Sequence, residues 1–151
     1  MASVTDAVHV TGHCYCGGIT YRVDIPAGPA LVKSGYCHCD SCRRAHAAPL
    51  YHVAIIDASA LEITAGAELL RPFTKPGGHI TRSFCCACGT RVLNRFDRWR
   101  PQGREAVAFF PSTLDAAIQS ALPPRLRPRF NSYAAECVLD SEALAEVLGT
   151  E

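Results

Sequence analysis

The sequence of 151 residues carries a formal net charge of +1, with 48% hydrophobic and 19% charged residues. This is the length of one domain with a buried core, and the composition is that of a globular protein, which excludes intrinsic disorder. A surface dedicated to nucleic acid or anionic membrane needs an excess of basic residues, so the near-zero charge favours small or weakly charged partners.

The first residues, MASVTDAVHV, lack a basic segment followed by a long apolar run, and no stretch approaches the ~20 apolar residues that span a bilayer. We therefore expect a cytoplasmic protein without a membrane segment. In a reducing compartment, the nine cysteines are expected to act as metal ligands or catalytic thiols rather than as a disulfide framework.

Short apolar segments rich in β-branched and aromatic residues recur along the chain, with Pro/Gly breaks between several of them. They predict strands over residues 19–25, 50–56, 60–65, 68–74, 79–84, 90–96 and 105–110. Many short strands indicate a mostly-β domain built from antiparallel sheets.

Helical signals are few, and we expect three short helices that are peripheral to the cysteines. They fall at residues 42–48, at 113–122 before two prolines, and at 141–149, where Ser141 can cap the first turn and Gly149 can end the helix. The segment PPRLRPRF, residues 123–130, has the composition of an extended basic connector.

Eight of the nine cysteines fall into three tight groups. These are Cys14 and Cys16 in HCYCGG, then Cys37, Cys39 and Cys42 in CHCDSC, and finally Cys85, Cys86 and Cys88 in FCCACGT. In a Cys-x-x-Cys-Gly turn two thiolates converge on one cation while glycine relieves the backbone, and the first group makes a similarly short chelate. These spacings are typical of metal turns, not of free buried thiols.

Spacing alone leaves the partition of the ligands open. Cys14, Cys16, Cys85 and Cys88 would complete a closed structural zinc site, and the triad of Cys37, Cys39 and Cys42 would then hold a second zinc with one open position. Alternatively, Cys39, Cys42, Cys85 and Cys88 would form a zinc ribbon, or His38 or His46 would close the triad as a fourth ligand.

Four segments of the sequence resemble the family of glutathione-dependent formaldehyde-activating enzymes and centromere-protein-V-like proteins. They are GHCYCGGITYRV (12–23), GYCHCDSCRRAHAAP (35–49), SFCCACGTRVLNRF (83–96) and, more weakly, FFPSTLD (109–115). The order and spacing of three cysteine groups make this resemblance specific. It implies one domain over residues 1–151, with a motif-bearing core at about 12–115 and a divergent part at 116–151.

By this resemblance, the fold is a β-tent of antiparallel sheets with two zinc ions per chain. The structural zinc is implied to be held by Cys14, Cys16, Cys85 and Cys88, and the catalytic zinc by Cys37, Cys39 and Cys42. The implied activity is that of a carbon–sulfur lyase, which interconverts S-(hydroxymethyl)glutathione with glutathione and formaldehyde.

Residues beside the triad supply candidate roles in such a reaction. Arg43 and Arg44 follow the triad, and a guanidinium pairs well with a carboxylate, of which glutathione has two; the alternative is that they face solvent. His46 lies four residues after Cys42 and would share its face of a helix. It could act as a general base, a transient ligand, a hydrogen-bond partner of a ligand or merely a packing residue.

The sequence also departs from the family pattern. Cys86 occupies a position where a small residue is common, and the region after residue 122 reads RPRFNSYAAECV in place of a histidine-aromatic strand. The substrate therefore stays open between glutathione, its adduct and a related thiol. The leading hypothesis is a zinc-dependent lyase with a small-molecule thiol partner and no nucleic acid; the alternative is a non-catalytic zinc-stapled module that binds a protein or nucleic acid.

Overall fold

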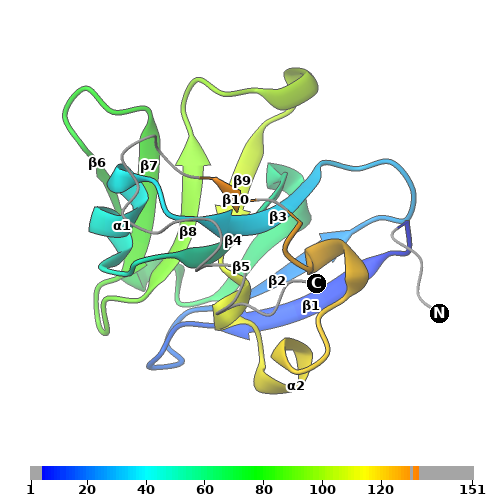
Figure 1. Cartoon of the computed structure of the whole chain (residues 1–151). Coiled ribbons are helices and arrows are strands. Elements are labelled where there is room, and N and C mark those ends of the chain that lie inside the picture. The colour runs from blue at the N-terminus through cyan, green and yellow to red at the C-terminus, as the bar shows by residue number, and fades with distance from the viewer. Residues whose placement is uncertain (1–4, 130, 133–151) are drawn as a thin grey trace.

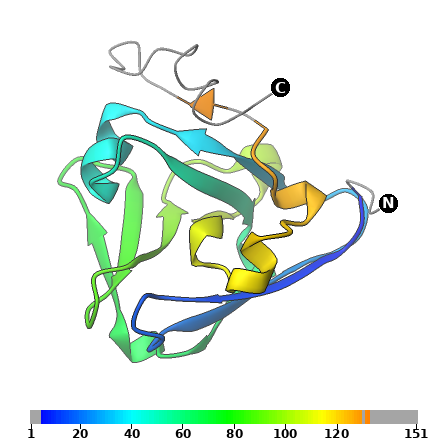
Figure 2. The ribbon, with the colours of Figure 1, turned by 60° about the horizontal axis from the view of Figure 1, so that its bottom comes forward.

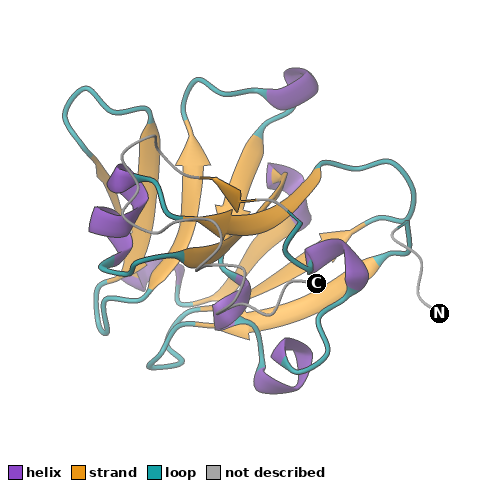
Figure 3. Cartoon of the chain, in the orientation of Figure 1, coloured by secondary structure: helices purple, strands orange, loops and turns teal. Residues whose placement is uncertain are grey.

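The structure is a computed structural model that describes residues 5–129, 131 and 132. Two β-sheets dominate it, with short helices in the connections between strands (Figures 1 and 3). The strands are β1 (Val8–His13), β2 (Thr20–Ile25), β3 (Val32–Cys37), β4 (Tyr51–Asp57), β5 (Leu61–Ala65), β6 (Leu70–Thr74), β7 (Ile80–Cys85), β8 (Arg91–Phe96), β9 (Ala106–Phe109) and β10 (Asn131–Ser132). The predicted mostly-β architecture is thereby confirmed.

The smaller sheet has the antiparallel order β1-β2-β5. Its first strand alternates buried Val8 and Val10 with exposed His9 and Thr11, as expected for a sheet that faces a core on one side only. Figure 2 shows the β1–β2 hairpin running along one side of the molecule. The hairpin also meets the segment after β9, because Gly12 bridges to Leu114 and the Tyr21 and Thr113 hydroxyls lie 2.7 Å apart.

The larger sheet has the order β10-β3-β4-β9-β8-β7-β6, and all its pairs are antiparallel except β10 with β3. The main core joins buried residues of both sheets, among them Val23, Ile56 and Phe109. A second apolar cluster is formed by Cys37, Cys42, Val53, Ala108 and Phe110. Two of the cysteines of the triad are therefore core residues.

All seven predicted strands form, within two residues at each end. The pattern failed to predict β1, β3 and the two-residue strand β10. In β3, the sequence VKSGYC places Ser34 and Gly35 side by side in buried positions, so no alternation of apolar and polar residues marks the strand.

The helices include α1 (Asp40–His46), α2 (Ala116–Gln119) and single 3-10 turns η1 (Ala58–Ala60), η2 (Ala67–Leu69), η3 (Pro101–Gly103), η4 (Pro111–Thr113) and η5 (Pro124–Leu126). Helix α1 begins two residues before its predicted start and contains Cys42, so it is not peripheral to the cysteines. The helix predicted at 141–149 lies outside the described residues. The longest of the described helices, α1, has seven residues, and none of them could span a bilayer.

The segment predicted as an extended basic connector is instead packed against the fold. Within η5, Leu126 is fully buried, and the buried Arg125 guanidinium donates hydrogen bonds to the carbonyl oxygens of Asp6, Pro26 and Gly28. The composition indicates a connector, but it does not reveal that backbone carbonyls satisfy Arg125 and let this segment pack against the fold.

Candidate metal centres

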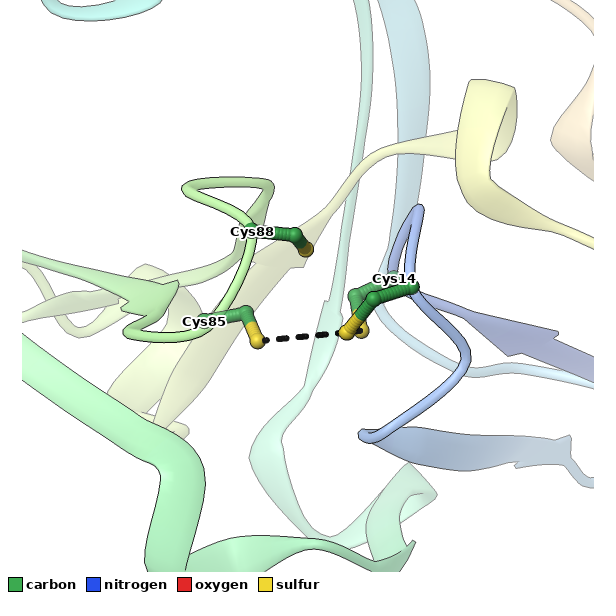
Figure 4. Close-up of side chains that lie close together, drawn as sticks. Cys14, Cys85 and Cys88 are labelled. Carbon is green, nitrogen blue, oxygen red and sulfur yellow. Dashed lines mark hydrogen bonds between the residues drawn. The ribbon is translucent and has the colours of Figure 1, made fainter.

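Four cysteines from two distant turns converge on one point. Cys14, Cys16, Cys85 and Cys88 place their sulfur atoms within 4.8 Å of one another, and Figure 4 shows the labelled sulfurs facing each other across the gap between the turns. The Cys14–Cys16 and Cys16–Cys85 sulfur distances are 3.5 and 3.9 Å. Four sulfurs at 2.3 Å from a tetrahedral ion lie about 3.8 Å apart, so this set fits a metal ion.

The backbone conformation of both turns is compatible with negatively charged sulfur atoms. The N–H groups of Gly18 and Ile19 point at Cys16 Sγ and Cys14 Sγ, at 3.4 and 3.3 Å. In the second turn Gly89 has a φ of +78°, a conformation that glycine adopts without strain, and its N–H donates to the Cys85 carbonyl at 2.7 Å. Amides aimed at the sulfurs favour their thiolate forms.

The protonation of this group is shared between its members. Hydrogen bonds from the Thr90 hydroxyl and amide, and from the Cys16 amide, lower the pKa of Cys88 to about 5. The pKa of Cys16 rises to about 11, because hydrogen bonds with Cys14 and Cys88 and some desolvation together outweigh the largest single effect, the Gly18 amide, which lowers it. A metal ion that displaces the shared protons would relieve this competition.

The triad forms a second group at the start of α1. Cys37 ends β3, Cys39 precedes the helix and Cys42 lies within it, with all three sulfurs within 4.8 Å and Cys37 Sγ 3.8 Å from Cys39 Sγ. Among the described residues, only three potential ligands converge here. Their spacing also fits a tetrahedral metal ion, with one position not filled by these residues.

Two thiols of the triad interact through a hydrogen bond. A hydrogen bond from Cys42 lowers the pKa of Cys37 to about 7. The hydrogen bond that Cys42 donates to Cys37, followed by the burial of Cys42, raises the pKa of Cys42. Three neighbouring thiolates cannot all be charged without a cation, so the donor set suits a divalent ion.

Two residues that the sequence did not suggest contact the triad. The Tyr51 hydroxyl donates to Cys42 Sγ at 3.2 Å, and Arg82 Nη2 lies 3.9 Å from the same sulfur. Neither residue lies in a recognisable motif. The antiparallel register that sets Tyr51 opposite Cys37 is the signal that would have revealed it, and that register depends on β3, which was not predicted.

The other residues singled out from the sequence lie around the triad but are not among its converging ligands. The His46 ring stacks on Tyr51 at 3.9 Å between centroids, and burial, followed by the charges of Arg91 and Arg82, lowers its pKa to about 4. Arg43 and Arg44 both lie within 4 Å of Asp40, with side chains 23% and 82% exposed. Buried His38 is not part of either group.

Cys86 is exposed and belongs to neither group, and Cys137 lies outside the described residues. The four-plus-three division therefore agrees with one of the partitions that the spacing left open, and it differs from a zinc ribbon of Cys39, Cys42, Cys85 and Cys88.

A cavity of about 330 Å³ lies beside both groups. Its lining includes Tyr51, whose hydroxyl reaches Cys42, and Thr90, whose hydroxyl is 3.2 Å from Cys88 Sγ. The charged residue in this lining is Arg91, which donates from Nε to the Ala45 carbonyl at 3.0 Å. The volume is near the lower end of small-molecule sites, roughly 300–1,000 Å³.

Both the sequence and the fold resemble those of known proteins. The sequence profile of the glutathione-dependent formaldehyde-activating enzymes matches residues 9–136. A protein of Emericella nidulans named as a candidate enzyme of this kind is 23% identical over 145 residues, covering 83% of this chain and 73% of the relative. A crystal structure of a Rhodobacter sphaeroides protein superposes with a TM-score of 0.56 at 22% identity, over 82% of this chain and 99% of that one.

The solved structure supports the fold, and the sequence profile covers both cysteine groups and the strands that carry them. The chain belongs to the family of glutathione-dependent formaldehyde-activating enzymes.

Proposed function

We propose that this protein is a zinc-dependent carbon–sulfur lyase that forms or cleaves the hydroxymethyl adduct of glutathione or of a related thiol. One observation carries the proposal: seven cysteines divide into a group of four and a group of three. Four thiolates saturate a tetrahedral zinc, whereas three leave a position for a substrate.

The reaction needs no oxidant or reductant. In the cleavage direction, the carbon–sulfur bond of the adduct breaks, its electron pair stays on sulfur, formaldehyde leaves, and the hydroxyl proton is transferred to the thiolate. A zinc ion at the triad would supply a Lewis acid for oxygen or stabilise the substrate thiolate. Cys37, Cys39 and Cys42 are proposed to hold it.

Arg43, Arg44 and His46 keep their proposed roles beside the triad. Arg43 is the better placed of the two arginines to bind a substrate carboxylate, because its Nε is buried without a hydrogen-bond partner and Arg44 is mostly exposed. His46 is neutral near pH 7, and its buried Nε2 also lacks a partner. It can therefore hold a proton only transiently, or orient a polar group of the substrate.

Exchange NMR with ¹³C-formaldehyde and glutathione tests the proposal. The wild-type protein should accelerate exchange between free formaldehyde and the adduct above the rate in buffer, and Cys39→Ser should not. Metal analysis of the same samples should give two zinc ions for wild type and one for the variant. Two tightly held metals without acceleration would contradict the lyase and favour a zinc-stapled binding module.

A further inference from the structure

Arg82, on β7, presents a buried positive charge to the triad. The residue is 8% exposed, and its Nη2 donates to Ser41 Oγ at 3.2 Å and lies 3.9 Å from Cys42 Sγ. Its Nε is also buried and has no hydrogen-bond partner. Within residues 5–129, no carboxylate lies within ion-pair distance of this guanidinium.

The neighbours of Arg82 do not balance its charge. Asn94, its cross-strand partner, is neutral and buried. Arg91 adds a second cation, and its pKa is lowered first by burial and then by the charge of Arg82. Three carbonyls satisfy the equally buried Arg125, whereas Arg82 donates to one neutral hydroxyl and has an unsatisfied Nε, so a negative group would stabilise its charge.

The metal-loaded triad has the matching charge. Three neutral thiols would contribute nothing, but three thiolates and one divalent ion sum to −3 + 2 = −1, which one guanidinium neutralises. We infer that Arg82 is the counter-ion of the metal-loaded triad and the positioning residue for Cys42. This inference rests on the proposed function, because it requires a metal at the triad.

Arg82 also makes the three ligands unequal. Cys42 Sγ receives the Tyr51 hydroxyl in addition to the guanidinium. These two contacts distinguish Cys42 from the other two thiols, so a change at Arg82 should act on the triad through Cys42.

The four-cysteine group is built differently. In the described part of the chain, its sulfurs accept from the Gly18 and Ile19 amides and contact the Thr90 hydroxyl, and no guanidinium reaches them. Removing the charge of Arg82 should therefore affect the metal of the triad selectively.

The test uses the full chain loaded with two zinc ions, and the variants Arg82→Gln and Arg82→Lys. Arg95→Gln is the control, because it removes an exposed arginine from the neighbouring strand β8. Metal release to a chromogenic chelator is followed for each site, together with the sulfur-to-cobalt absorption band after cobalt substitution. Loss of a partner of a metal ligand weakens metal binding by roughly 10–100-fold.

Arg82→Gln should lose the triad metal in that range and retain the other metal. Arg82→Lys should restore part of the affinity of the triad for its metal, because lysine keeps the charge but lacks the planar N–H donors of the guanidinium. Arg95→Gln should match wild type. Unchanged release from Arg82→Gln would overturn the inference alone. A wild type that binds one metal would overturn the proposed function as well. If Arg82→Gln does not fold, Arg82→Lys is used in its place. A selective loss of metal affinity at the triad then supports the counter-ion role, and an equal loss at both sites contradicts it.

Discussion

Cys37 at the end of β3 lies directly opposite Tyr51 at the start of β4 in the antiparallel register. The chain between them forms α1 and returns the Tyr51 hydroxyl to Cys42. The triad is thus a local structure, completed within one strand–helix–strand segment. The four-cysteine group instead joins a turn near residue 15 to one near residue 87. The two centres should therefore contribute unequally to stability.

Replacing a ligand in each centre should separate these contributions. Cys85→Ser should release its metal and abolish cooperative folding, because structural zinc supplies ~10–16 kcal/mol in small zinc peptides, comparable to the whole stability of a domain, ~5–15 kcal/mol. Cys39→Ser should lose one metal and keep its fold. Metal analysis and thermal unfolding of both variants measure this difference.

Cys86→Ser is the matched control for Cys85→Ser. It makes the same chemical change one residue away, at an exposed thiol outside both groups. It should retain both metals and the wild-type melting temperature. Equal destabilisation by Cys39→Ser and Cys85→Ser would contradict the division into a local and a cross-linking centre.

The Tyr51 hydroxyl should strengthen metal binding at the triad. Tyr51→Phe removes the hydrogen bond to Cys42 Sγ, and a hydrogen bond to a charged group contributes about 1.5–3 kcal/mol. The triad metal should therefore dissociate at least tenfold more readily in a chelator competition. Tyr36→Phe, beside Cys37, is the control and should behave as wild type; if both variants lose metal equally, the hydroxyl has no specific role.

Sequence reasoning identified the cysteines that converge, because their spacing within each group is a local signal. Cys-x-x-Cys turns bring their sulfurs together with little help from the rest of the fold. It did not find Arg82 or Tyr51, because Tyr51 is placed by the register of β3 with β4, and Arg82 comes from β7, 40 residues along the chain from Cys42. The strand β3 was missed for a related reason: its buried Ser34 bonds to the Leu126 carbonyl, a long-range partner that apolar periodicity does not register.

His52 should make the fold less stable in mild acid. Burial lowers its pKa to about 4, against the ordinary value of 6.5, and its Nε2 lies 2.7 Å from Ser34 Oγ. Between these two pH values the unfolded chain binds a proton that the folded chain does not bind. The free energy of unfolding therefore falls as the pH decreases from about 6.5 towards 4.

Comparing wild type with His52→Gln in urea at several pH values isolates this effect. Glutamine keeps a donor for Ser34 but does not titrate, and acid-induced changes at the cysteines occur in both proteins. The stability advantage of wild type over the variant should shrink steadily below pH 6.5. Parallel pH profiles would show that His52 is not the buried neutral histidine described above.

Gly66 should control the packing of the turn that holds Cys14 and Cys16. Its φ is +75°, and a Cβ there would overlap the Gly18 carbonyl, next to the amide that points at Cys16 Sγ. Gly77 has nearly the same φ, +74°, but a Cβ there would meet nothing within 4 Å.

Both Gly→Ala changes should lower the free energy of unfolding by about 1–2 kcal/mol, because alanine is strained in the left-handed conformation. Gly66→Ala should lower it by about 1–3 kcal/mol more, because its Cβ overlaps the Gly18 carbonyl. Urea unfolding with zinc analysis should show the extra loss, and weaker metal retention, only in Gly66→Ala; equal losses would mean that the turn shifts freely and that the Gly18 amide is not held in place by this contact.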